Sequence, residues 1–317
     1  MSKMKLLLSA AVGAVALAGL TVSASAQTIG FSQVGHESDW RTAFSKNMQD
    51  DAKAEGITLK FSDANQKEED QLKAVRSFIA QKVDAIIIAP VVVTGWDQVL
   101  KEAKAANIPV FLVDRDVDTA DKSLYVTRVS ADFNLEGRLA GAWLAQALKG
   151  KGDIVELQGT VGSAAAEYRK TGFNAVEALF PLIKTVKSQS GDFTTQGGKE
   201  VMESFIKATD GLKNIKAVWA HNDNMMLGAI QAMKEAGLKP GKDILTVSVD
   251  GVPDIFKAML AGDANASVEL RSDIGPDIYG VVKAYLGGKK EWPKWVVIPS
   301  DLHTVQDAAE VLKKKGG

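Results

Sequence analysis

Apolar runs alternate with stretches of helical period along most of this chain. Residues 85–89 form an unbroken apolar run rich in isoleucine, which is typical of a parallel strand buried on both faces. In residues 42–55, Phe44, Met48 and Ala52 recur every four residues and therefore share one face of a helix. The same criteria predict further strands at 28–31, 57–62, 110–113, 154–157, 185–188, 217–220, 244–249 and 266–268, and helices at 68–81, 95–106, 135–144, 169–179, 198–208 and 223–236.

This alternation indicates two α/β lobes. Repeated βα units build a parallel sheet with helices on both faces. The alternation restarts after about Ala131 without repeating in sequence, and no proline-rich linker separates the two halves. The length of 317 residues also suggests two domains rather than one core. We therefore predict two similar lobes joined by several short crossings, with the chain returning late to the first lobe.

The first 26 residues form a separate segment. They contain a basic start, an apolar run over residues 6–20, and the small-residue cleavage motif Ala-Ser-Ala at 24–26. The apolar run is short for a membrane span. We predict a signal peptide over residues 1–26, a mature chain that begins at Gln27, and export to the periplasm.

Composition narrows the possible partners. The chain has no cysteine, so it has no disulfide and no thiol for a lipid anchor, which favours a free periplasmic protein over a tethered one. The formal net charge of −1 argues against a nucleic-acid partner, because binding phosphates requires a basic face.

Few residues suggest catalysis. There is no G-x-S-x-G elbow, no cysteine nucleophile and no P-loop, and His36, His221 and His303 lack the spacing of zinc ligands. Carboxylate pairs are present, so a glycosidase stays open as an alternative. We expect a protein that is not an enzyme and that uses no metal and no cofactor.

Polar and aromatic side chains gather where the predicted strands end. An open α/β sheet binds ligands beyond the carboxyl ends of its strands. Such positions hold Trp40-Arg41, Asp114-Arg115, Arg169, Asp192-Phe193, Asn222-Asp223, Asp250-Gly251 and Glu269. Carboxylates accept hydrogen bonds from hydroxyl groups, arginine donates them, and aromatic rings cover the C–H faces of a sugar. Together these groups suit a hydroxyl-rich ligand.

Each of these groups also has a purely structural explanation. Trp40 could pack on its own sheet, and Asp223 could cap the following helix, which we favour over a ligand role for that residue. Asp250-Gly251 could be an ordinary turn, and Asp114-Arg115 a local ion pair. Their convergence on one edge of the fold favours a binding site.

A set of segments, most of them near predicted strand ends, has the sequence of a known family. These are 30–35, 88–91, 94–96, 113–115, 155–162, 188–193, 221–223, 250–254 and 264–269. They resemble the periplasmic solute-binding proteins of the ribose/galactose type, which feed ABC sugar importers, and among them the galactofuranose binders of enteric bacteria. The resemblance covers most of the mature chain to about Leu270 and is weaker beyond it.

The resemblance implies two Rossmann-like lobes with parallel sheets, joined by a hinge of three crossings and closing on a sugar. The N-terminal lobe would comprise residues 27–131 and about 270–298, and the C-terminal lobe residues 132–269 and about 299–317. The family's binding positions correspond here to Ser32, Trp40, Arg41, Asp114, Arg115, Arg169, Phe193, Asn222, Asp250 and Glu269.

The chain departs from the family at a few of these places. Ribose binders usually have Gln where this chain has Glu269, and Glu is what the galactofuranose binders have. After Ala131-Asp132 the family commonly has an Asn that touches the sugar, whereas this chain has Phe133 followed by Asn134. Either that amide contact is lost or Asn134 provides it.

We therefore predict a monomeric periplasmic binding protein that captures a monosaccharide, galactofuranose by resemblance, and delivers it to the permease of an ABC importer. Another pentose, hexose or polyol is an alternative ligand, and chemotaxis or sensing an alternative role. A repressor of the related fold is disfavoured, because the signal peptide stands where a DNA-reading helix would be.

Overall fold

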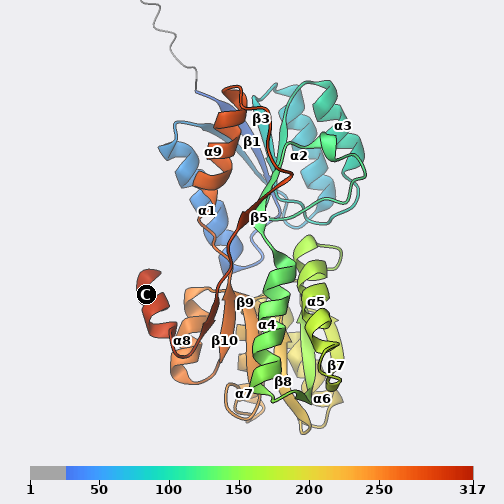
Figure 1. Ribbon diagram of the computed structural model, residues 1–317, viewed down its shortest axis with the longest axis vertical. Coiled ribbons are helices and arrows are strands. Elements are labelled where there is room, and N and C mark those ends of the chain that lie inside the picture. The colour runs from blue at the N-terminus through green and yellow to red at the C-terminus, as the bar shows by residue number, and fades with distance from the viewer. Residues whose placement is uncertain (1–25, 317) are drawn as a thin grey trace, which may run out of the picture.

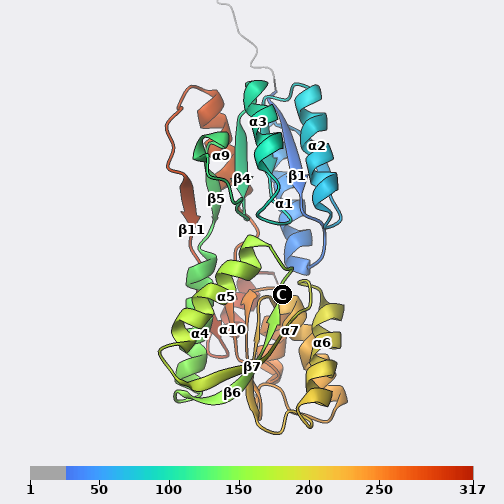
Figure 2. The ribbon, with the colours of Figure 1, turned by 90° about the vertical axis from the view of Figure 1, so that its right-hand side faces the viewer.

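The computed structural model describes residues 26–316 and shows two α/β lobes, one above the other in Figure 1. The predicted signal peptide lies outside the described residues, apart from Ala26. In the view turned by 90° the two lobes stay separate bodies joined by a narrow waist (Figure 2). The expectation of two α/β lobes with parallel sheets is confirmed.

The first lobe is built on a parallel six-stranded sheet with the order β11-β5-β4-β3-β1-β2. Its strands are β1 (Thr28–Gln33), β2 (Thr58–Asp63), β3 (Ala85–Ile88), β4 (Val110–Val113), β5 (Arg128–Ala131) and β11 (Trp295–Ile298). Its helices are α1 (Asp39–Ala54), α2 (Glu68–Ala80), α3 (Asp97–Ala105) and α9 (Gly275–Leu286), with a short 3-10 turn η1 (Lys122–Leu124).

The second lobe repeats this plan with the sheet order β12-β10-β9-β8-β6-β7. Its strands are β6 (Lys151–Gln158), β7 (Leu182–Ser190), β8 (Ile215–Ala220), β9 (Leu245–Asp250), β10 (Ala266–Glu269) and β12 (Leu302–Thr304), of which only β12 is antiparallel to its neighbour. Its helices are α4 (Phe133–Ala147), α5 (Ala164–Glu177), α6 (Thr195–Ala208), α7 (Asp223–Glu235), α8 (Pro253–Ala261) and α10 (Ala308–Lys314).

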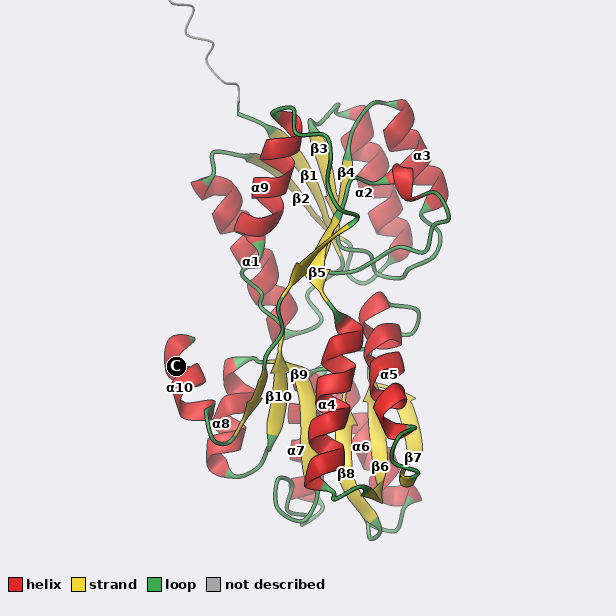
Figure 3. Cartoon of the chain, viewed as in Figure 1, coloured by secondary structure: helices red, strands yellow, loops and turns green. Residues whose placement is uncertain are grey.

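The chain passes between the two sheets at three places, which we call the first, second and third crossings (Figure 3). The first joins β5 to α4, the second joins β10 to α9, and the third joins β11 to β12. Ligands of open α/β sheets bind beyond the carboxyl ends of the strands. In both lobes the strands β1, β4, β6, β8 and β9 end at the interface between the lobes.

Some short strands were not predicted. The segment of β5 contains Arg128 and Ser130, yet all four of its residues are buried. The edge strands β11 and β12 are four and three residues long. Polar residues hide β5 from a search for apolar runs, and β12 is only three residues long. Strand β11 is an apolar run that was nevertheless not among the predicted strands.

Helices α6 and α7 of the second lobe pack backbone against backbone. A Cβ atom added to Gly228 in α7 would lie 2.0 Å from the carbonyl oxygen of Thr195 in α6. A Cβ atom added to Gly198 in α6 would lie 2.2 Å from the carbonyl oxygen of Met225. Glycine is therefore required at this contact because no other residue leaves room for the facing backbone.

We predict that Gly228→Ala lowers the free energy of unfolding by about 1–3 kcal/mol, since the added methyl group forces α6 and α7 apart. Gly280→Ala is the matched control, because nothing lies within 4 Å of a Cβ atom at that helical position. It should stabilise the protein by about 0.5–1 kcal/mol through helix propensity. Urea unfolding without sugar measures both, and equal effects of the two substitutions would contradict the packing argument.

Candidate ligand-binding site between the lobes

Residues from both lobes enclose one small cavity at the facing ends of the sheets. It is lined by Glu37, Ser38, Trp40, Arg41, Asp114, Arg115, Ala165, Arg169, Phe193, Asn222, Asp250 and Leu270. Eight of the ten positions predicted as binding residues are in this set. They come from the two halves of the chain, as expected for a site that forms when the lobes meet.

The lobes are closed on each other. The backbone N–H of Asp39 in α1 donates to Oδ1 of Asn224 in α7 at 3.1 Å, and Nδ2 of Asn224 donates to Oδ2 of Asp39 at 3.0 Å. A backbone bond of 2.9 Å also joins the N–H of Val93 to the carbonyl of Gly162. The enclosed cavity has a volume of about 20 Å3, room for about one water molecule. A larger ligand therefore enters only when these walls separate.

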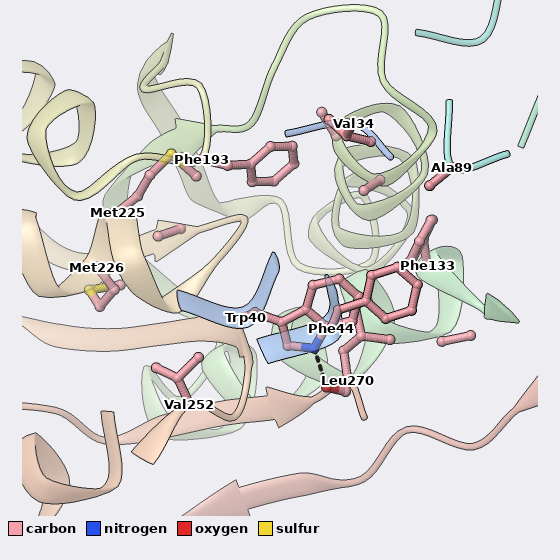
Figure 4. Packing of buried hydrophobic residues seen from close by; sticks show 14 of the residues in the cluster. Val34, Trp40, Phe44, Ala89, Phe133, Phe193, Met225, Met226, Val252 and Leu270 are labelled. Atoms are coloured by element: carbon pink, nitrogen blue, oxygen red, sulfur yellow. Dashed lines mark hydrogen bonds between the residues drawn. The ribbon is translucent and has the colours of Figure 1, made fainter. Parts of the chain in front are cut away.

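Trp40 and Arg41 stand at the start of α1. The Arg41 guanidinium donates to Oδ2 of Asp114 at 2.6 Å and to Oε1 of Glu37 at 3.3 Å. It lies 4.8 Å from the centre of the Trp40 ring. That indole stacks on Phe44 at 5.2 Å and donates from Nε1 to the Leu270 carbonyl at 2.6 Å (Figure 4). Trp40 is thus both part of the core and part of the cavity wall.

Asp114 and Arg115 follow β4 directly. Asp114 has a φ of 61°, a left-handed conformation that is strained for a residue with a side chain. Its main partner is Arg41, which lies 2.6 Å from Oδ2 of Asp114, whereas Nε of Arg115 lies 3.9 Å from the same oxygen. The local ion pair between Asp114 and Arg115, which the sequence offered as an alternative to a binding role, is therefore the longer of the two contacts.

Arg115 is held by the loop after β3 and by Glu37. One terminal nitrogen donates to the Val91 carbonyl at 3.0 Å and the other to Oε1 of Glu37 at 3.4 Å. Its Nε has no hydrogen-bond partner among residues 26–316. Burial and the neighbouring charge of Arg41 lower the pKa of Arg115 from 12.5 to about 10. A buried donor of this kind is costly unless a ligand accepts from it.

Arg169 in α5 forms the centre of the second wall. Its Nε donates to Oε2 of Glu136 at 2.8 Å, and a terminal nitrogen donates to the His221 carbonyl at 2.7 Å. Its other terminal nitrogen lies 3.5 Å from Oδ1 of Asp250. Three separate elements thus fix the plane of this guanidinium.

Asp250 ends β9 with a φ of 120°. Burial raises the pKa of Asp250 well above its usual value, despite the neighbouring charge of Arg169. The following loop is fixed by Asp223, which accepts from the Val252 N–H at 2.9 Å and from the hydroxyl of Ser267 at 2.8 Å. Burial also raises the pKa of Asp223 to about 6.

The favoured role of Asp223 as a helix cap is wrong. The side chain of Asn222 caps α7, because it accepts from the N–H of Met225 at 3.0 Å. The amide of Asn222 also donates to the carbonyl of Phe193 at 3.0 Å and so fixes that loop. Phe193 has a φ of 64° and its ring lies 5.4 Å from the Arg115 guanidinium carbon across the cavity.

Two predicted binding residues do not line the cavity. Ser32 is buried within β1. Glu269 ends β10 but faces an open groove at the hinge, where it binds Nε2 of His303 at 3.1 Å and the ammonium group of Lys315. A hydrogen bond from His303 is the main reason that the pKa of Glu269 falls to about 2. Both residues stand near the end of a strand, which suggested that their side chains face the cavity. Neither side chain does so.

Phe133 is buried and lies 5.2 Å from the guanidinium carbon of Arg169. It does not line the cavity between the lobes. Asn134 does not line the cavity either, and lies in a separate outer groove that also includes Phe133, Arg138, Tyr168 and Trp295.

The sequence-based search missed Glu37 and Glu136. The Glu37 side chain is 2% exposed and lies between Arg41 and Arg115. It precedes Ser38, the N-cap of α1, so its spacing of four residues before Arg41 is not a helical one. Glu136 is fully buried in the first turn of α4. The only sequence signal near it is Phe133, which stands where the family commonly has Asn.

Nothing in residues 26–316 suggests a metal centre, since no three His, Asp or Glu side chains there are grouped to hold an ion. None of the helices in this part of the chain is long and apolar enough to cross a membrane.

Comparison with known proteins agrees with this geometry. Residues 29–310 match the model of the periplasmic binding protein domain. This chain belongs to that family. It is 55% identical to the galactofuranose-binding protein YtfQ of Escherichia coli (strain K12) over 98% of both chains.

Two solved structures are similar in both sequence and fold. A crystal structure of a galactofuranose binding protein has 56% identity and a TM-score of 0.90, with coverage of 92% of this chain and 98% of that one. The periplasmic binding protein of the arabinose ABC transporter from Shewanella sp. ANA-3, bound to α- and β-L-arabinofuranose, has 57% identity and a TM-score of 0.89, with coverage of 91% and 95%. The lobes therefore have the fold of a periplasmic sugar-binding protein.

The hinge groove generates a prediction for pH dependence. A hydrogen bond to Glu269 raises the pKa of His303 above 6.5, and a hydrogen bond to Asp307 raises it further by a smaller amount. A raised histidine pKa contributes stability that is complete below about pH 6.5 and is lost as the pH rises through the folded-state value. The lowered pKa of Glu269 keeps its side of the pair charged down to about pH 2.

We therefore expect the melting temperature of the wild type to exceed that of His303→Gln most at about pH 5–6, and the difference to shrink towards pH 9. Calorimetric melts at a series of pH values measure it. A difference that stays constant from pH 6 to pH 9 would show that the charge of His303 does not matter.

Proposed function

We propose that this protein captures a monosaccharide in its furanose form, galactofuranose first of all, and delivers it to an ABC importer. The cavity between the lobes carries the proposal. Three buried arginines and the carboxylates of Glu37, Asp114 and Asp250 line one space from both lobes. Membership of a family of periplasmic binding proteins makes capture and release the relevant activity, and the relatives named above are binding proteins rather than enzymes.

The charges of the site favour a neutral ligand. Arg41 lies beside Asp114, Arg115 beside Glu37, and Arg169 beside Glu136. A phosphorylated or acidic sugar would bring a charge that no free partner balances. Hydroxyl groups instead accept from the arginines and donate to the carboxylates, and each hydrogen bond to a charged group is worth roughly 1.5–3 kcal/mol.

The sugars named for the two similar binding proteins share one ring. D-Galactofuranose and L-arabinofuranose have the same configuration at ring carbons 2, 3 and 4 and differ in the group attached to carbon 4. We infer that the residues of this cavity recognise that furanose ring. On this proposal, the predicted residues at the cavity, Trp40, Arg41, Asp114, Arg115, Arg169, Phe193, Asn222 and Asp250, are the sugar-binding set.

We further propose that residues 27–131 with 270–298, and residues 132–269 with 299–316, move as two bodies about the three crossings. A sugar that contacts both walls shifts the population from an open to the closed form. The permease would recognise that closed form. We propose that the mature protein begins at Gln27 and acts as a free periplasmic monomer without nucleic acid, metal or cofactor.

Calorimetric titration tests this function. We expect binding of L-arabinose and of D-galactose, whose solutions contain furanose forms, and no binding of D-galacturonate. Failure to bind any furanose, pentose or hexose would overturn the proposal.

Arg115→Ala should weaken that binding at least tenfold, because it removes a buried donor and leaves Glu37 without one of its partners. Arg76→Ala is the matched control, since Arg76 forms an exposed ion pair with Glu102 away from the cavity. The control should bind like the wild type. Equal affinities of the two variants would show that Arg115 is not a sugar-binding residue.

A further inference from the structure

The support of Arg169 extends beyond the cavity to the hinge. Two of the groups that hold its guanidinium, the Phe133 ring and the Glu136 carboxylate, lie in the first turn of α4. That turn begins directly after the first crossing. The arginine is 2% exposed, so these neighbours and the His221 carbonyl set its position without help from solvent.

Glu136 uses its second oxygen to bind the third crossing. Its Oε1 accepts from the hydroxyl of Ser300 at 3.0 Å, while its Oε2 accepts from Nε of Arg169 at 2.8 Å. Ser300 stands between the end of β11 at Ile298 in the first lobe and the start of β12 at Leu302 in the second. Two consecutive hydrogen bonds therefore lead from the cavity wall to a hinge segment.

The Arg169 end of this path is rigid. A Cβ atom added to Gly137 in α4 would lie 2.0 Å from the carbonyl oxygen of Arg169, and one added to Gly172 in α5 would lie 2.1 Å from that of Asn134. With the two helices in such contact, Arg169 and Glu136 move together. The Ser300 bond is then the link that reaches a segment whose torsions must change when the lobes separate.

We propose that Glu136 is a positioning residue that couples the sugar contact at Arg169 to closure of the hinge through Ser300. This inference rests on the proposed function. The Ser300 bond holds the third crossing in its closed arrangement, and a sugar bound at Arg169 keeps Glu136 oriented to accept that bond. By linkage, loss of the bond weakens sugar binding although Ser300 lines no part of the cavity.

A merely structural role predicts something different. If Glu136 only balances the charge of Arg169, the Ser300 hydroxyl has no influence on sugar affinity. Any effect of removing it would then appear as a lower melting temperature of the sugar-free protein. Affinity, dissociation rate and sugar-free stability together separate the two explanations.

The test uses Ser300→Ala in the mature full-length protein with L-arabinose and D-galactose as probes. Stopped-flow mixing followed by tryptophan fluorescence reports closure, because Trp40 donates to Leu270 in the second crossing. We expect roughly 10- to 150-fold weaker binding, the cost of one hydrogen bond to a charged group. The loss should be in the dissociation rate, with association changed less than about twofold, as for most affinity differences.

Four further variants sharpen the result. Ser300→Thr keeps a hydroxyl group and should restore affinity to within about threefold of the wild type. Glu136→Gln should weaken binding, and adding Ser300→Ala to it should have little further effect, because both act through one path. Ser272→Ala, a serine of the second crossing whose hydroxyl accepts from Asn47, is the matched control and should bind like the wild type.

The outcomes are separable. Wild-type affinity and dissociation rate in Ser300→Ala would overturn the coupling, and so would equal losses in Ser300→Ala and Ser300→Thr. Additive losses in the double variant would assign the two residues independent effects and overturn it as well. A wild type that binds neither probe nor any other sugar would overturn the proposed function and this inference with it.

Discussion

Three buried arginines shared between two lobes constrain the rest of this structure. Arg41, Arg115 and Arg169 are each at most 3% exposed. Removing such charges from water costs several kcal/mol per ion unless partners and hydrogen bonds compensate. Glu37, Asp114 and Glu136 provide that compensation, each at hydrogen-bonding distance from a guanidinium. All three arginines and two of these carboxylates, Glu37 and Asp114, line the cavity between the lobes.

The backbone near the site is strained where it serves this arrangement. Asp114, Phe193 and Asp250 all have φ values between 61° and 120°. Such conformations cost of order 1–3 kcal/mol each and persist only where the surroundings determine them. Here Arg41 holds Asp114, Asn222 holds the carbonyl of Phe193, and Asp223 holds the loop after Asp250. These strained conformations lower the stability of the fold, and they occur at residues that line the cavity between the lobes.

Sequence predicted the frame of the fold because its central strands are buried on both faces. The runs at β3 and β4 are apolar throughout, whereas β5 mixes Arg128 and Ser130 with apolar residues and went unnoticed. The residues that line the cavity were largely predictable for a similar reason, since parallel strands bring their carboxyl ends to one edge. The direction in which each side chain points could not be predicted in this way. Gly30 faces Phe78 of α2 and Phe31 faces Phe44 of α1, so the alternation along β1 turns Ser32 towards the α2 side and away from the cavity.

The supporting carboxylates show the limit of sequence inference most clearly. Glu136 acts through contacts with Arg169, 33 residues away, and with Ser300, 164 residues away. No local pattern links these positions, because they meet only after both lobes and the third crossing have formed. The same holds for Glu269, whose partners His303 and Lys315 come from the last segment of the chain.

A crystal structure of the complex with galactofuranose tests the central claim most directly, because it shows which side chains the sugar touches. The account predicts the furanose ring between the lobes, with hydroxyl groups at hydrogen-bonding distance from Arg41, Arg115 and Arg169, and with the lobes closed around it. A sugar bound in the hinge groove beside Glu269 and His303, or bound to one lobe without contact to the arginines of the other, would contradict it.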